Sequence, residues 1–354
     1  MVLGIRVGVC AEEARPGAVN GADSYKKAFS IYDGLSAQEQ AVIRGSALEP
    51  NGAFADTLYE KVQPMMELLK EGRRAGNVDW KLGKPSFFRP FPNLSEMQKL
   101  VYAVRFEAGR KFRTDGGDAV EDVTALEAMG RSAPRNLLGA LVYFGIHAMG
   151  TRMLAQGAAS IPASADADLA YFLDPEEPAR MYEEGIKGEA AFLRAVVAEY
   201  KNPATRSGSD IVKYAGDPKA DTEKLDADGL CAGCTWLAET DEGIAMRVRD
   251  PEPEFQKWWS ERATDGARVK VSGEILSGLE NLRARMQGTE AFNAMLKAGL
   301  ALERNDNAGF EKIVDPASGK PFAYAASGAG FVLTTATNST GKALSLDFTK
   351  PVSR

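Results

Sequence analysis

The chain has 354 residues, of which 44% are hydrophobic and 26% are charged, and its formal net charge is -6. A chain of this length and composition can bury a large core, and its acidity excludes a broadly basic surface of the kind that binds nucleic acid or anionic membranes. His147 is the only histidine, so a histidine-rich zinc site is excluded and a Ser-His-Asp triad would have to use this residue. It lies in an apolar helical run over 137–149, which favours a packed histidine over a catalytic base.

Residues 1–19 are predicted to be the remnant of an export signal or to be disordered. Val9 and Ala11 have the small-residue spacing of a signal peptidase site and precede Glu12. No run of about 18 apolar residues follows, so no membrane span is expected. The protein is therefore expected to be exported, to the periplasm or the extracellular space.

Residues 20–200 are predicted to form a helical domain. Apolar residues recur at helical spacing over 22–48, where Ser36 opens a second helix with a capping box. The same periodicity predicts a helix over 53–72, and Pro64 is expected to kink or end it.

A helical hairpin is predicted over 95–129, with its turn at 115–118, and further helices are predicted over 134–153 and 183–200. One such antiparallel pair resembles a tetratricopeptide unit, but the chain lacks the repeat period of about 34 residues. A basic cluster on the first helix of this hairpin is interpreted as a solvated face: Arg105, Arg110, Lys111 and Arg113.

Residues 201–229 read as an acidic loop or linker, and residues 230–354 as an α+β domain. Alternating apolar residues predict a β-hairpin over 235–249, and a further strand is expected at 268–271. A long helix is predicted over 274–303. The fold class is therefore α+β, with a helical N-terminal part and a small antiparallel sheet and long helix in the C-terminal part.

The closing segment has the clearest local signals. Turn residues at 315–320 and at 327–330 flank short apolar runs, which predict a β-hairpin, and 343–348 is expected to add to it. Four side chains of this hairpin are expected to pack against the helix that ends near Glu303: Phe322, Tyr324, Phe331 and Leu333.

Residues 20–29, the triplet 78–80, the helices over 95–154 and the segment 315–333 resemble an uncharacterised family of secreted helical proteins of planctomycete and verrucomicrobial type. Members of this family close with a DPxSGKPF hairpin, which is also similar to the C-terminal sheets of pseudopilins. The chain departs from the family over 274–303, where members carry an LYRLEHGRYP passage. The resemblance implies export and a fold, but no catalytic residues.

Cys231 and Cys234 form a Cys-x-x-Cys pair, which could act as a redox pair or supply half of a zinc site. A redox motif normally opens a helix after a strand, whereas this pair precedes a predicted strand. A small local disulfide or two packed thiols is the favoured interpretation. No metal site is predicted.

Carboxylates are the most plentiful catalytic groups, and two of them with different pKa values could hydrolyse a glycoside or a peptide. Four candidates lie in the acidic segment: Asp217, Asp221, Asp226 and Asp228. Three more acids follow, at Glu239, Asp241 and Glu242. A solvated acidic loop is the favoured interpretation, and no cofactor is predicted because Gly319 and Gly341 lack phosphate-loop spacing.

Several aromatic residues could form a stacking platform for a sugar or a peptide, although aromatics in loops more often fill a core. The candidates are Trp80, Phe87, Phe88, Trp258 and Trp259.

The sequence therefore favours an exported, non-enzymatic scaffold or binding protein with a protein or polymer partner at the cell surface. The alternative is a carboxylate-dependent hydrolase, of glycosidase or protease type, that acts on an extracellular polymer. This alternative requires two of the acids over 217–242 to face each other in a concave site.

Overall fold

The computed structural model describes residues 20–45, 53–81, 94–215, 226–268, 273–328, 330–336 and 343–348. The helices are α1 Gly21–Asp33, α2 Ala37–Ile43, α3 Ala53–Arg74, α4 Leu94–Lys111, α5 Gly116–Arg131, α6 Leu137–Gly157, α7 Ala170–Leu173, α8 Glu177–Lys201, α9 Asp210–Ala215, α10 Ala227–Met246, α11 Glu252–Arg268, α12 Gly273–Glu303 and α13 Asn307–Glu311. The strands are β1 Ala323–Ser327, β2 Gly330–Thr334 and β3 Ser345–Phe348. This composition confirms the predicted α+β class with a small C-terminal sheet.

Side-chain caps fix the starts of the N-terminal helices. The predicted capping box at Ser36 and Glu39 is confirmed, and Asp115 caps α5 at the predicted turn by accepting from the backbone N–H of Gly117 and Asp118. In contrast, α3 continues through Pro64 to Arg74, so the expectation that Pro64 ends the helix is wrong. The buried face of α3, which includes Val62, Met65 and Leu69, offsets the lost backbone hydrogen bond.

The predicted β-hairpin over 235–249 is wrong, because this segment belongs mainly to α10. Asp226 caps α10 by accepting from the N–H of Gly229. Ile244 and Val248 are both buried while Met246 is 76% exposed, so the apparent alternation is one face of a helix and the turn after it. The expected loop over 201–229 is also partly helical, since it contains α9 and the start of α10. The strand expected at 268–271 begins at Arg268, which is the last residue of α11, and its other residues lie outside the described chain.

The predicted closing hairpin is confirmed. Its strands are antiparallel in the order β1-β2-β3, with Tyr324 opposite Leu333 and Phe331 opposite Phe348. Phe331, Leu333 and Phe348 are buried, and Gly299 on α12 leaves room for the Phe348 ring. Tyr324 is 56% exposed, so its expected packing against the helix is wrong.

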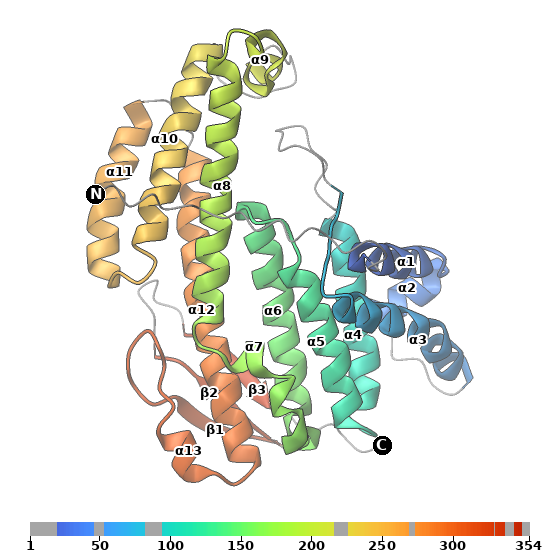
Figure 1. Ribbon diagram of the computed structural model, residues 1–354. Helices are drawn as coiled ribbons and strands as arrows, with labels where there is room; N and C mark the ends of the chain where they lie inside the picture. The colour runs from blue at the N-terminus through green and yellow to red at the C-terminus, as the bar shows by residue number, and fades with distance from the viewer. Residues whose placement is uncertain are drawn as a thin grey trace, which may run out of the picture.

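The buried side chains form three clusters that α6, α8 and α12 connect. The largest runs from Ala22 on α1 to Phe348 on β3, the second joins α6, α8, α10, α11 and α12, and the third joins α8, α9 and α10. Figure 1 shows α12 alongside α8 and α6 with its end at the sheet. Elements on both sides of the expected boundary at 201–229 share the first two clusters, and a division into two domains stays a prediction.

Helix α6 is the central apolar element. Within the described residues, only the segment Leu137–Ser160 is long and apolar enough to cross a membrane, and 61% of it is buried inside the protein. Burial by neighbouring helices is typical of the core helix of a globular protein, so this segment is weak evidence for a membrane span.

Candidate functional site

The predicted acidic residues do not form a common site in the part of the chain that the structure describes. Asp217 and Asp221 lie outside that part, and Asp226 is the cap of α10. The carboxylate of Asp228 is 79% exposed and accepts from the Tyr200 hydroxyl at 2.7 Å. Asp228 and Glu239 line one shallow pocket, but they lie about 16 Å apart along α10 at about 1.5 Å rise per residue. This separation is too long for a pair of glycosidase carboxylates.

Cys231 and Cys234 are both buried in α10, with free thiols, and pack against α8 and α9. Burial raises the pKa of the Cys234 thiol to about 11, and the nearby Cys231 and Glu189 act in the same direction. A thiol with this pKa stays protonated at neutral pH, which is unfavourable for a redox nucleophile. The geometry therefore supports two packed thiols. No three His, Cys, Asp or Glu side chains among the described residues gather to hold a metal ion.

His147 is fully buried in α6. Its Nδ1 lies 2.7 Å from Glu127 Oε1, and its Nε2 lies 2.7 Å from Asn293 Oδ1 on α12. Burial alone would lower the pKa of His147, but the Glu127 carboxylate and the two hydrogen bonds raise it above its usual value. His147 therefore joins α5, α6 and α12 inside the core and is not open to a substrate.

The predicted aromatic platform is not assembled as one surface. Phe87 and Phe88 lie outside the described residues, and Trp259 is buried in the second cluster, where Trp258 packs beside it. Trp80 belongs to the first cluster and packs against α1, which lies on the opposite side of the molecule from α11 (Figure 1). Its ring stacks on Tyr25 at 5.8 Å between centroids, and its Nε1 donates to the Ser132 carbonyl at 2.9 Å. Trp80 therefore fills the core, and it also forms the wall of a pocket.

This pocket has a volume of about 780 Å³ and lies between the end of α3, the end of α5 and the junction that leads to α6. We name it the arginine pocket, because Arg73, Arg131 and Arg135 line it together with Trp80 and Tyr171. These arginines come from two separate stretches of the sequence, and none of them was predicted as a site residue. Arg131 and Arg135 are four positions apart, but this spacing spans the end of α5 and is not a recognisable sequence motif.

Each arginine of the pocket is held by an acidic side chain from a neighbouring element. Arg73 Nη2 donates to Asp168 Oδ1 at 2.7 Å, and its Nη1 donates to the Thr124 hydroxyl at 2.6 Å. Arg135 Nη1 lies 2.8 Å from an oxygen of Glu184. These contacts orient the guanidinium groups, as a preorganised binding site requires.

Arg131 contacts both an acidic side chain and an aromatic ring. Its Nε lies 2.8 Å from Glu177 Oε1, and its guanidinium stacks on the Tyr171 ring with 3.6 Å from Cζ to the centroid. Tyr171 is 45% exposed, so this stacked pair reaches the surface. The aromatic side chain of the pocket that is open to a ligand is therefore Tyr171, which was not among the residues selected from the sequence.

Tyr25 also lines the arginine pocket. Its side chain is fully buried, and its hydroxyl has no hydrogen-bond partner among the described residues. Gly72 on α3 permits this arrangement, because a Cβ at that position would lie 2.3 Å from the Tyr25 ring. An unpaired buried hydroxyl costs about 1–3 kcal/mol, so a group that pairs with it would be stabilised.

A second pocket, of about 720 Å³, lies between the start of α11, the middle of α12 and the turn at 315–318. Glu252 and Glu290 both line it. Burial raises the pKa of Glu290 to about 7, against the opposing charge of Arg249. Burial also acts to raise the pKa of Glu252, but hydrogen bonds from Gln256 and Gln287 and the charge of Arg283 bring it below its usual value.

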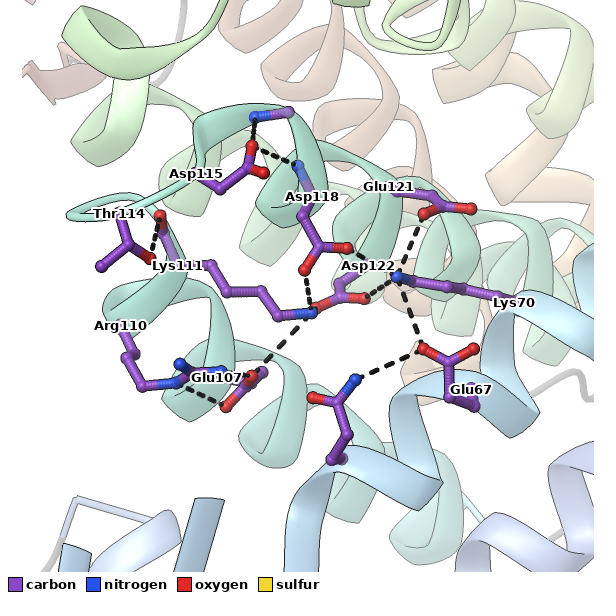
Figure 2. A network of polar contacts seen from close by, with 12 residues as sticks. Glu67, Lys70, Glu107, Arg110, Lys111, Thr114, Asp115, Asp118, Glu121 and Asp122 are labelled. Carbon is purple, nitrogen blue, oxygen red and sulfur yellow. Dashed lines mark hydrogen bonds and ion pairs between the residues drawn. The ribbon is translucent and has the colours of Figure 1, made fainter. Parts of the chain in front are cut away.

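A buried network of ion pairs joins α3, α4 and α5 (Figure 2). Lys111 Nζ lies 2.6 Å from Asp122 Oδ2 and 2.7 Å from Asp118 Oδ2, and Lys70 Nζ lies 2.8 Å from Asp118 Oδ1. Lys111 is 3% exposed, so its predicted position on a solvated face is wrong. The network fixes the helices that carry the arginine pocket.

Comparisons with protein-family models, with curated proteins and with solved structures found no match to this chain. The resemblance carried by the segment 315–333 therefore stays a prediction.

Proposed function

We propose that this protein is an exported, non-enzymatic binding protein whose helical bundle presents the arginine pocket to a protein or polymer partner at the cell surface. The observation that carries the proposal is a pocket of about 780 Å³ at the ends of α3 and α5, whose arginines are paired with acids of neighbouring elements. Pockets of this volume, with a few polar groups on a rigid frame, are typical of ligand sites.

Export is supported by the sequence alone. The small-residue spacing at Val9 and Ala11 and the resemblance to secreted helical proteins both favour it. A partner at the cell surface follows from this location.

Blocking the arginine pocket with Ala128→Trp is expected to reduce partner capture at least about tenfold, which corresponds to about 1.4 kcal/mol of binding free energy. Ala128 lines the pocket from α5 and is half-buried, so a larger side chain fills the space without removing a charge. The measurement is quantitative mass spectrometry of cell-surface proteins and polymers retained by the immobilised full chain. Ala232→Trp, on an exposed position of α10, is the matched control. Equal capture by the wild type and Ala128→Trp, or equal loss in both variants, would contradict the proposal.

A second candidate function is the carboxylate-dependent hydrolase, with residues other than the predicted ones. Glu252 and Glu290 line one pocket and have pKa values displaced in opposite directions. A protonated and an ionised carboxyl group in one site are the two groups that acid–base hydrolysis requires. In this role Glu290 would give a proton to the leaving group, and Glu252 would stabilise the developing positive charge.

If this second function is correct, Glu290→Gln is expected to lower the hydrolysis rate by about 10²–10⁴-fold, the usual contribution of a general acid. The assay measures new reducing ends or new amino groups from a panel of polysaccharides and proteins. Glu280→Gln changes an exposed acid of the same pocket and should leave the rate unchanged. Absence of hydrolysis by the wild type across the panel, or an unchanged rate in Glu290→Gln, rules out this candidate.

A further inference from the structure

We propose that the arginine pocket binds an oxyanion, namely a carboxylate or phosphate group of its ligand. This inference rests on the proposed function, in which the pocket is the binding site, and it adds the chemistry of the group that is recognised. Guanidinium groups recognise both oxyanions through paired N–H donors in a planar fork.

The ionised side chains that line the pocket are mainly basic. Arg73, Arg131 and Arg135 line it, whereas Asp79 is the only acidic residue among the described residues of its wall. Each arginine is paired with an acid of a neighbouring element, which offsets its charge. The pocket therefore attracts an anion through its guanidinium N–H donors and not through a net positive charge.

The acids that hold the arginines leave donors available. Each guanidinium carries five N–H donors. Arg73 uses one donor for Asp168 and one for Thr124, and Arg135 is held by Glu184. The acids that pair with the arginines are not among the residues that line the pocket, and each guanidinium group keeps N–H donors that its acid does not use.

Tyr25 provides an independent indication of a ligand. Its hydroxyl is buried, belongs to a residue of the pocket wall and has no partner in the described chain. Arg73 lines the same pocket. An anionic oxygen that reaches the Tyr25 hydroxyl would accept a hydrogen bond from it, as it would from a guanidinium group. The unpaired hydroxyl and the arginines therefore indicate the same type of ligand atom.

The apolar side of the pocket limits what can accompany the oxyanion. Trp80, Val78 and the exposed Tyr171 ring form a wall against which a flat or aliphatic group can pack. The ligand is therefore expected to join an oxyanion to a partly apolar body, and a fully hydrated ion would use only part of the site.

Isothermal titration calorimetry of the full chain with citrate, inorganic phosphate and glycerol tests this inference. Citrate and phosphate are expected to bind and glycerol is not, and the tighter of the two anions identifies carboxylate or phosphate as the recognised group. Arg135→Gln should weaken anion binding about tenfold, the effect of losing one charge-assisted hydrogen bond. Arg135 is 50% exposed, so the variant should fold.

Arg194→Gln is the matched control, because Arg194 is 49% exposed and pairs with Glu242 at 2.6 Å on a remote surface. It should bind anions as the wild type does. Arg131→Lys keeps the charge but loses the planar fork and the stacking on Tyr171, so it should weaken binding. The double variant Arg131→Lys with Arg135→Gln should weaken binding more than Arg131→Lys alone. The inference is overturned if neither anion binds, or if Arg194→Gln weakens binding as much as Arg135→Gln. If the inference fails in this way but Ala128→Trp still reduces partner capture, the proposed function remains supported.

Discussion

Replacing Lys111 with methionine is expected to lower the free energy of unfolding by about 3–5 kcal/mol, the cost of breaking a buried ion pair by removing one partner. The Lys111 ammonium is the shared partner of Asp118 and Asp122, and Asp122 is completely buried. Methionine has a similar length but supplies no charge. Asp122 would then keep only Lys70, at 3.1 Å, as its cationic partner.

Chemical denaturation followed by circular dichroism measures this change. Lys187→Met is the control, because Lys187 is 62% exposed and pairs with Glu183 on the surface of α8, and it should change the free energy of unfolding by less than about 1 kcal/mol. The double variant Lys111→Met with Asp122→Leu removes both charges of this ion pair and is expected to recover part of the loss. If Lys111→Met costs no more than Lys187→Met, the network does not contribute to stability.

Local sequence signals correctly predicted those elements whose structure depends on residues close together in the sequence. The caps at Ser36 and Asp115 and the turns of the closing hairpin depend on residues a few positions apart, and the structure contains all of them. The prediction of a β-hairpin over 235–249 was wrong because the apolar residues of this segment fit both a strand and a helix over a short window. Packing of α10 against α8, which places Cys231, Cys234 and Ala238 on one buried face, decides in favour of the helix.

The candidate site was much less predictable. Trp80 was selected from the sequence and does line the arginine pocket, although it does so as part of the core. The arginines of the pocket were not selected, because Arg73 and Arg131 are brought together only by the packing of α3 on α5. The ion-pair network was missed for a related reason. Lys111 and Asp122 lie on two helices joined by a tight turn, and only the hairpin geometry turns their spacing into a buried contact.

Replacing Asp241 with asparagine is expected to raise the free energy of unfolding at pH 7 by up to about 4 kcal/mol, at 1.36 kcal/mol per pKa unit. Asp241 is 1% exposed on α10, and neither carboxylate oxygen has a hydrogen-bond partner among the described residues. Burial raises the pKa of this carboxyl group from 3.8 to about 8, and the charges of Glu189 and Glu242 act in the same direction. Folding at neutral pH therefore requires Asp241 to take up a proton, and asparagine removes this requirement.

The pH dependence separates this effect from a general change in packing. Between pH 4 and pH 8 the folded protein keeps the Asp241 proton and the unfolded chain has released it, so stability falls as the pH rises through this window. The advantage of Asp241→Asn should be small near pH 4 and grow steadily to pH 8, as urea denaturation at several pH values would measure. Glu39→Gln is the control, because hydrogen bonds from Lys61 and Ser36 lower the pKa of Glu39, and this variant should show no such gain. A gain for Asp241→Asn that is the same at pH 4 and pH 8 would mean that packing and not ionisation is responsible.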